Sequence, residues 1–198
     1  MPAVAEHSTT ADRSGSAVVD IDVVIVGAGF SGLGMACNLK QAGYDDFVVL
    51  EKADEVGGTW RENTYPNCAC DVPSNLYSFS FAPKADWPHT YSRQPAIQQY
   101  LRDTADLFGL REHTRFGCEF LDAGWDDETM AWEVQTSDGP VCARVLVAAM
   151  GPLHIPSVPD LPGIEQFEGT AFPCAKWDDE ADLQGPTVAR AVNGDPAI

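Results

Sequence analysis

The hydrophobic pattern near the start of the chain predicts a strand, a helix and a second strand. Residues 21–26, IDVVIV, form a β-branched run typical of a strand buried on both faces of a parallel sheet. A helix is expected over residues 33–40, ending near Gly43, and a second apolar run, residues 47–50, leads into Glu51. Strands that alternate with helices in this order indicate an α/β fold.

A different pattern, between residues 116 and 147, predicts a small antiparallel β-ribbon. Hydrophobic and polar residues alternate over 132–136, and the sequence SDGP at 137–140 favours a turn. Residues 116–121 also look like a strand. The two tryptophans of this ribbon are expected to be packing residues rather than ligands: Trp125 and Trp132.

A glycine motif of the form G-x-G-x-x-G, residues 27–32, joins the first strand to the helix. In such motifs the first glycine permits a tight turn, the second lets the backbone approach a pyrophosphate, and the third lets the helix pack on the strand. These positions are Gly27, Gly29 and Gly32. The helix N-terminus adds amide donors and a favourable dipole, and Glu51 can accept hydrogen bonds from both ribose hydroxyls of an adenosine.

The dinucleotide that this unit favours is FAD. A second glycine pair, Gly57 and Gly58, follows soon after Glu51 in the sequence EVGGTW. That arrangement is similar to the extended fingerprint of FAD-binding proteins with two dinucleotide sites, whereas an NAD enzyme would more often continue directly into its next strand–helix unit. The sequence therefore predicts a Rossmann-like FAD-binding domain, a parallel sheet with flanking helices, plus the antiparallel ribbon.

Several further segments carry a family likeness. The longest is GTWRENTYPNCACDVPSNLYSFSF, residues 58–81, and the others are residues 87–88, 91–92, 95–108, 145–153 and 167–178. Together they resemble the Baeyer–Villiger type of flavin-containing monooxygenases, over residues 20–198. The resemblance implies an FAD-dependent, monooxygenase-like oxidoreductase that acts on a small molecule.

The resemblance also implies the residues of an FAD site. Around the pyrophosphate it places Gly27, Gly29, Phe30, Ser31 and Gly32. At the adenosine it places Glu51, Lys52 and the backbone of Phe120. Towards the flavin it places Gly57, Gly58, Thr59, Trp60, Asp71 and Tyr77. Met150 and Gly151 complete the set, and Asp71 is the catalytic candidate, although Asp71 can also be read as the acceptor of a turn.

The likeness to a complete oxygenase weakens towards the end of the chain. Pro173 stands where the family signature F-x-G-x-x-x-H-x-x-x-W has histidine, and Met150 replaces the threonine of Ala-Thr-Gly. The family's NADPH motif would fall at residues 187–197, where Val192 takes the first glycine position and Arg190 interrupts the apolar run. We therefore expect a truncated relative that does not bind NADPH in the family manner.

The charge and the cysteines narrow the partners. A formal net charge of −18 with 12 Lys and Arg argues against nucleic acid, which needs clustered cations. Residues 1–18 are expected to be a flexible tail without a signal peptide, and no run is long enough to span a membrane. The six cysteines lack the paired C-x-x-C spacing of a zinc site, so we expect no metal site. We expect the cysteines to be free thiols in a reducing cytoplasm. Cys68 and Cys70 leave open a soft-metal site or a strained disulfide.

The expected organisation is a tail over residues 1–18, the FAD-binding domain over 19–160, and a linker with a vestigial NADP-binding start over 161–198. Four functions remain open. The first is an oxidoreductase that takes electrons from another protein, and the second is an FAD-binding subunit completed by a second copy or a partner chain. The third is a non-redox enzyme or scaffold in a biosynthetic pathway, and the fourth is a fragment without activity of its own.

Overall fold

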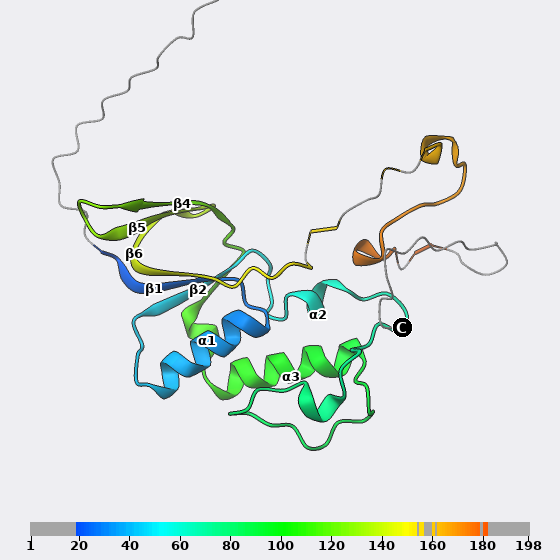
Figure 1. Cartoon of the computed structure of the whole chain (residues 1–198), viewed down its shortest axis with the longest axis horizontal. Helices are drawn as coiled ribbons and strands as arrows, with labels where there is room; N and C mark the ends of the chain where they lie inside the picture. The colour runs from blue at the N-terminus through cyan, green and yellow to red at the C-terminus, as the bar shows by residue number, and fades with distance from the viewer. Residues whose placement is uncertain (1–18, 154, 157–159, 161, 179, 182–198) are drawn as a thin grey trace, which may run out of the picture.

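A parallel β-sheet with helices on one side forms the centre of the molecule (Figure 1). The computed structural model describes residues 19–181 apart from 154, 157–159, 161 and 179. The helices and strands of this part follow in chain order: β1 (Ile21–Val26), α1 (Phe30–Gln41), β2 (Phe47–Glu51), α2 (Thr59–Glu62), α3 (Gln94–Leu107), β3 (Thr114–Phe116), β4 (Phe120–Asp126), β5 (Ala131–Thr136) and β6 (Gly139–Ala148). Short 3-10 turns lie at Ser74–Leu76, Leu110–His113, Ile164–Gln166 and Cys174–Lys176.

The strands form one sheet in the order β3-β2-β1-β6-β5-β4. β1 pairs in parallel with both β2 and β6, and β2 pairs in parallel with β3. β5 runs antiparallel to both β6 and β4. The long strand β6 therefore belongs to the parallel sheet at its carboxyl end and to an antiparallel meander at its amino end.

The two faces of the parallel sheet bury different residues. Ile25 and Val49 pack towards the helices, against Leu33 of α1 and Leu101 of α3. Val24 and Leu50 pack on the opposite face, which the meander covers. Figure 1 shows the resulting layers, with α1 and α3 below β1 and β2 and with β4 and β5 above them. Burial on both faces explains why the strands β1 and β2 are nearly all apolar.

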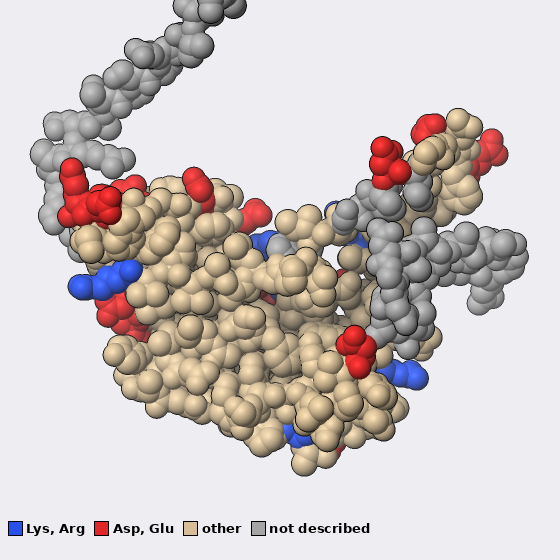
Figure 2. Space-filling view, in the orientation of Figure 1, with Lys and Arg blue, Asp and Glu red and all other residues tan. Residues whose placement is uncertain are grey.

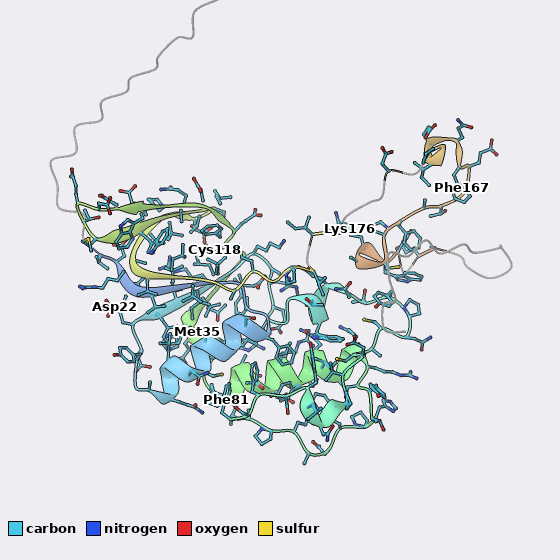
Figure 3. All side chains as sticks on the ribbon, viewed as in Figure 1. Asp22, Met35, Phe81, Cys118, Phe167 and Lys176 are labelled. Atoms are coloured by element: carbon cyan, nitrogen blue, oxygen red, sulfur yellow. The ribbon has the colours of Figure 1, made fainter. Side chains whose placement is uncertain are left out.

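Two labelled side chains in Figure 3 mark these layers. Phe81 lies on the helix side, where its ring stacks on Phe79 at a centroid distance of 4.9 Å. Cys118 lies on the side of the meander and is fully buried there. In the meander, Trp125 and Trp132 pack edge to face at 5.5 Å, in agreement with the packing role expected for them. The α/β fold predicted from the sequence is confirmed.

One predicted strand, residues 116–121, is wrong. β3 ends at Phe116 and β4 begins at Phe120, because Gly117 takes a left-handed backbone conformation with φ of +69°. The N–H of Gly117 donates to the carbonyl of Ala53 at 2.9 Å, and the N–H of Cys118 donates to the carbonyl of Glu51 at 3.0 Å. The chain therefore turns across the end of β2 between the two strands.

Membrane spans, metal ligands, thiols and surface charge bear on the partners expected from the sequence. Within the described residues, no helix is long and apolar enough to cross a membrane, and no three His, Cys, Asp or Glu side chains gather as metal ligands would. All six cysteines are free thiols in the structure. Figure 2 shows acidic side chains around the meander, while the surface over the helices is mostly uncharged on this face. The predicted tail, residues 1–18, lies outside the described residues.

Candidate functional site

A cleft of about 780 Å³ lies at the carboxyl ends of β1, β2 and β6. This volume is within the range of about 300–1,000 Å³ that is usual for small-molecule and cofactor sites. The chain leaves β1 towards β2 on one side, whereas β6 joins β1 on the other. Ligands of open α/β sheets bind at such a switch in strand order, outside the carboxyl ends of the strands.

Glycine backbone forms the floor of the cleft. Gly27 has φ of +100°, and a Cβ there would lie 2.7 Å from the carbonyl oxygen of Ala149, so the turn after β1 requires glycine. The Cα atoms of Gly29 and Gly58 face each other, because a Cβ on Gly29 would lie 3.7 Å from the Cα of Gly58. The N–H of Gly57 donates to the carbonyl of Ala28 at 2.9 Å and joins the two glycine turns. A narrow cradle without side chains results.

Helix α1 opens directly from this cradle. Its N-cap is Gly29, and within the described chain no side chain caps it and no acid stands in its first turn. The first amides of a helix have no partner within the helix and form a natural anion site. Gly32 lies behind the cradle, where a Cβ would stand 1.8 Å from the carbonyl oxygen of Gly27. Gly32 therefore sets how closely α1 approaches the turn.

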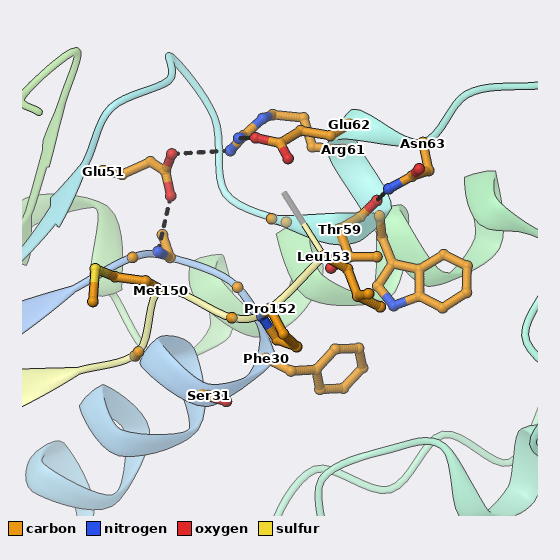
Figure 4. Close-up of a pocket in the computed structure, with 18 of the residues that line it drawn as sticks. Phe30, Ser31, Glu51, Thr59, Arg61, Glu62, Asn63, Met150, Pro152 and Leu153 are labelled. Atoms are coloured by element: carbon orange, nitrogen blue, oxygen red, sulfur yellow. Dashed lines mark hydrogen bonds and ion pairs between the residues drawn. The ribbon is translucent and has the colours of Figure 1, made fainter. Parts of the chain in front are cut away.

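An acid, Glu51, stands at the end of β2 beside the cradle and is only 4% exposed. Its Oε2 accepts the N–H of Ala28 at 2.9 Å, and its Oε1 accepts the N–H of Ala53 at 3.0 Å. Oε1 also forms an ion pair with Nη1 of Arg61 at 3.1 Å, as Figure 4 shows. Because a carboxylate oxygen can accept about two hydrogen bonds, Oε2 keeps capacity for a ligand hydroxyl.

Aromatic side chains form the opposite wall. The indole N–H of Trp60 donates to the hydroxyl of Tyr77 at 3.0 Å, and the ring of Phe30 meets that of Tyr77 edge to face at 4.9 Å. Burial raises the pKa of Tyr77 above its usual value, although the Trp60 hydrogen bond opposes the shift. Burial likewise raises the pKa of Cys68 and of Cys70, which also line the cleft. The phenol and both thiols are therefore protonated at neutral pH.

Helix α3 supports the loop that carries the second glycine pair. The side-chain amide of Gln98, which is buried, donates to the carbonyl of Val56 at 2.8 Å. Glu55 forms ion pairs with Arg111 at 3.0 Å and Arg102 at 3.3 Å. Burial favours the neutral form of Glu55, but the hydrogen bonds of Arg111 and Val56 and the nearby arginine charges win, so the pKa of Glu55 is lowered. The buried hydrogen bond from Gln98 and the ion pairs of Glu55 together hold this loop in place.

The structure brings the residues predicted from the sequence into this one cleft, with the exception of Gly32, which packs behind it. Glu51 is buried, whereas Lys52, Asp71 and Met150 are exposed. The Oδ1 of Asp71 lies 3.9 Å from Sγ of Cys70 at the edge of the site. The binding and catalytic roles of these residues stay predictions.

Sequence reasoning missed part of the lining: Arg61, Glu62, Asn63, Tyr65, Cys68, Cys70, Pro152, Leu153 and Ile155. For Arg61, the available signal was a basic residue directly after the glycine pair and Trp60. In the terminal segment, Pro173 precedes a short 3-10 turn, and Trp177 packs edge to face on Phe172 at 5.1 Å. The predicted NADPH motif, residues 187–197, lies outside the described residues.

Comparisons with known proteins agree with this geometry. A family model described as an NAD(P)-binding Rossmann-like domain matches residues 25–104. A Baeyer–Villiger monooxygenase of Streptomyces coelicolor is 52% identical over 178 residues, which cover 90% of this chain and 34% of that protein. An FAD-binding monooxygenase of Aspergillus niger is 37% identical over 188 residues, covering 89% of this chain and 31% of the relative.

Solved structures show the same likeness. Cyclohexanone monooxygenase bound to epsilon-caprolactone has a TM-score of 0.74 and 39% identity, covering 82% of this chain and 33% of that one. The complex of OTEMO with FAD and NADP has a TM-score of 0.75 and 31% identity, and the match covers 85% of this chain and 33% of that one. The chain thus spans about a third of the length of the relatives that it matches. Over that third, its sequence and its fold are similar to those of the Baeyer–Villiger-type flavin monooxygenases.

Proposed function

We propose that this chain binds FAD in the cleft at the carboxyl ends of β1, β2 and β6. The observation that carries the proposal is the bare cradle between Gly29 and Gly58, which opens onto the uncapped start of α1. A pyrophosphate needs close backbone approach and amide donors, and this cradle offers both. Glu51 stands beside it with spare acceptor capacity for a ribose hydroxyl.

The cleft residues divide by their place along such a dinucleotide. Those proposed for the ADP half are Gly27, Gly29, Phe30, Ser31, Glu51, Lys52, Phe120, Met150 and Gly151, with Gly32 behind them. Those proposed for the flavin half are Gly57, Gly58, Thr59, Trp60, Asp71 and Tyr77. The support is that all but Gly32 line one continuous cleft.

We also propose that the chain contributes to an FAD-dependent, monooxygenase-like oxidoreductase acting on a small molecule. The cofactor, when bound, supplies electron transfer and oxygen activation. The chain's own residues bind and orient it, and the apolar wall around Trp60 and Phe30 excludes water from one side. Asp71, at the exposed edge of the cleft, is the side chain proposed to act nearest the reacting atoms.

A second copy or a partner chain is proposed to cover the open side of the cleft. Three apolar side chains stand exposed on its rim: Met150 at 47%, Leu153 at 66% and Ile155 at 74%. Figure 4 shows Met150 and Leu153 beside the site. Native mass measured with and without FAD tests this point. A strictly monomeric FAD complex would contradict it.

NADPH is proposed not to reduce the bound flavin without another protein. The support is Val192 at the first glycine position of the matching motif, with Arg190 in the apolar run before it. Anaerobic mixing of the FAD-loaded protein with NADPH tests this directly. Flavin absorbance should persist, and rapid bleaching by NADPH alone would show the proposal to be wrong.

FAD binding itself is tested by fluorescence titration of the purified protein. Saturable quenching is expected for the natural chain, with weaker binding for Glu51→Ala, which removes a ribose acceptor worth on the order of 1–3 kcal/mol. A matched control is Gly124→Ala on β4, where a Cβ has no heavy atom within 4 Å. Equal affinity of Glu51→Ala and the control would contradict the assigned site.

A further inference from the structure

Arg61 is a cleft residue with three partners from three different segments. Its Nη1 lies 3.1 Å from Oε1 of Glu51 and donates to the carbonyl oxygen of Glu55 at 2.7 Å. Its Nη2 donates to Oε1 of Glu62 at 2.7 Å. The guanidinium therefore joins the end of β2, the loop before the glycine pair and the short helix α2.

The contact between Arg61 and Glu51 is shielded from water. The side chains of Arg61 and Glu51 are 16% and 5% exposed. A buried carboxylate requires hydrogen-bond donors or an opposite charge, and the loss of one partner leaves the other uncompensated. Arg61 is the cation paired with Glu51 among the ion pairs of the described residues. The N–H groups of Ala28 and Ala53 also hold the Glu51 carboxylate, and Arg61 adds the opposite charge that compensates it.

Through its contacts, Arg61 connects Glu51 with the loop that carries the second glycine pair. Glu51 is the ribose acceptor under the proposed function, and Glu55 begins the loop that ends in Gly57 and Gly58. Because one guanidinium contacts both Glu51 and the Glu55 carbonyl, the distance between the acid and the glycine pair is constrained. Figure 4 shows the ion pair between Arg61 and Glu51 on the side of the cleft away from Phe30 and Ser31.

We propose that Arg61 is a positioning residue for dinucleotide binding. It holds the Glu51 carboxylate in register with the glycine cradle, so that the ribose and the pyrophosphate of one ADP group are recognised together. This inference rests on the proposed function. Arginine suits the role because its planar fork donates in several fixed directions, whereas a lysine ammonium acts as a single point charge.

A double-mutant cycle on ligand affinity tests the role. The variants are Arg61→Met, which keeps the aliphatic stem, together with Arg61→Lys, Glu51→Gln and the combination of Arg61→Met with Glu51→Gln. FAD and ADP are the probes, and their Kd is measured by titration at constant pH and salt. The melting temperature of each unliganded variant reports fold stability separately.

Arg61→Met is expected to weaken FAD and ADP by the same factor, on the order of tenfold. In the Glu51→Gln background the same change should matter by less than about twofold, because the partner through which Arg61 acts is already neutral. Arg61→Lys should recover only part of the affinity. If Arg61→Met does not fold, Arg61→Lys completes the same cycle.

A merely structural arginine gives a different result. Equal affinity losses in the Glu51 and Glu51→Gln backgrounds would overturn the inference while the proposed function stands. A loss for FAD without a loss for ADP would do the same, because ADP carries the ribose and pyrophosphate that Arg61 is proposed to serve. Failure of the natural chain to bind either ligand would overturn the proposed function and the inference with it.

Discussion

Two glycines of the first turn, Gly29 and Gly32, are expected to respond in opposite ways to the same substitution. A Cβ on Gly32 would lie 1.8 Å from the carbonyl oxygen of Gly27, where 3.0 Å is the closest approach that real Cβ atoms show. Helix α1 must therefore move by roughly 1 Å in Gly32→Ala, an overpacking that costs about 1–3 kcal/mol or more. The higher helix propensity of alanine offsets at most about 1 kcal/mol of this.

Gly29 has no such clash. Its φ of −83° and ψ of −166° suit alanine, and the nearest heavy atom to an added Cβ is the Cα of Gly58 at the ordinary distance of 3.7 Å. Gly29→Ala should change stability by less than about 1 kcal/mol, because a gain of about 0.4–1 kcal/mol through the unfolded state opposes the lower preference of alanine for the N-cap position. The methyl group would, however, occupy the cradle proposed for the pyrophosphate.

Thermal unfolding and FAD titration separate the two effects. With about 2–4 °C per kcal/mol for a chain of this size, a net cost near 2 kcal/mol lowers the Tm of Gly32→Ala by about 4–8 °C. Gly29→Ala should keep its Tm and lose at least roughly tenfold in FAD affinity, equivalent to about 1.4 kcal/mol. Gly124→Ala serves as the control for both. Unchanged FAD affinity in a stable Gly29→Ala protein would show that the pyrophosphate does not lie over Gly29.

Three more predictions concern ionisation and exposure. The pKa of Glu55 is lowered in the folded protein, so the charged side chain stabilises the fold above the unfolded pKa of about 4.3, and this stabilisation is lost as the pH falls through the folded pKa. The Tm difference between the natural chain and Glu55→Gln should therefore shrink in acid. A Tm difference that stays constant with pH would contradict this. FAD should protect Met150 from hydrogen peroxide but not the exposed Met130, as peptide mass mapping would show; equal protection would remove Met150 from the site. Of the six thiols, Cys142 and Cys174 should react with a thiol reagent before unfolding, and rapid reaction of the four buried thiols would contradict the packing.

The parts of the site that sequence predicted are those that depend on neighbouring residues in the chain. A glycine is needed at Gly27 because the turn there has positive φ, and Glu51 is the last residue of its strand. Such requirements are local and leave a pattern that can be read without the fold. The α/β class follows for the same reason, since the strands β1 and β2 are apolar apart from Asp22 and Glu51.

The parts that sequence did not predict depend on contacts between distant segments. Gln98 lies 42 residues from Val56, whose carbonyl it binds, and nothing in the helix pattern marks it. The bend at Gly117 is fixed by hydrogen bonds to the carbonyls of Glu51, at the end of β2, and Ala53, in the loop after it, so an apparently continuous strand is divided. The role of Arg61 arises only when β2, the glycine loop and α2 meet.

FAD binding is tested most directly by stoichiometric titration of the purified, flavin-free chain with FAD, monitored by flavin fluorescence and absorbance. We predict saturable binding of one FAD per chain, with a perturbed flavin spectrum and a marked loss of affinity in Gly29→Ala. A folded chain whose addition changes neither the fluorescence nor the spectrum of FAD would contradict this prediction.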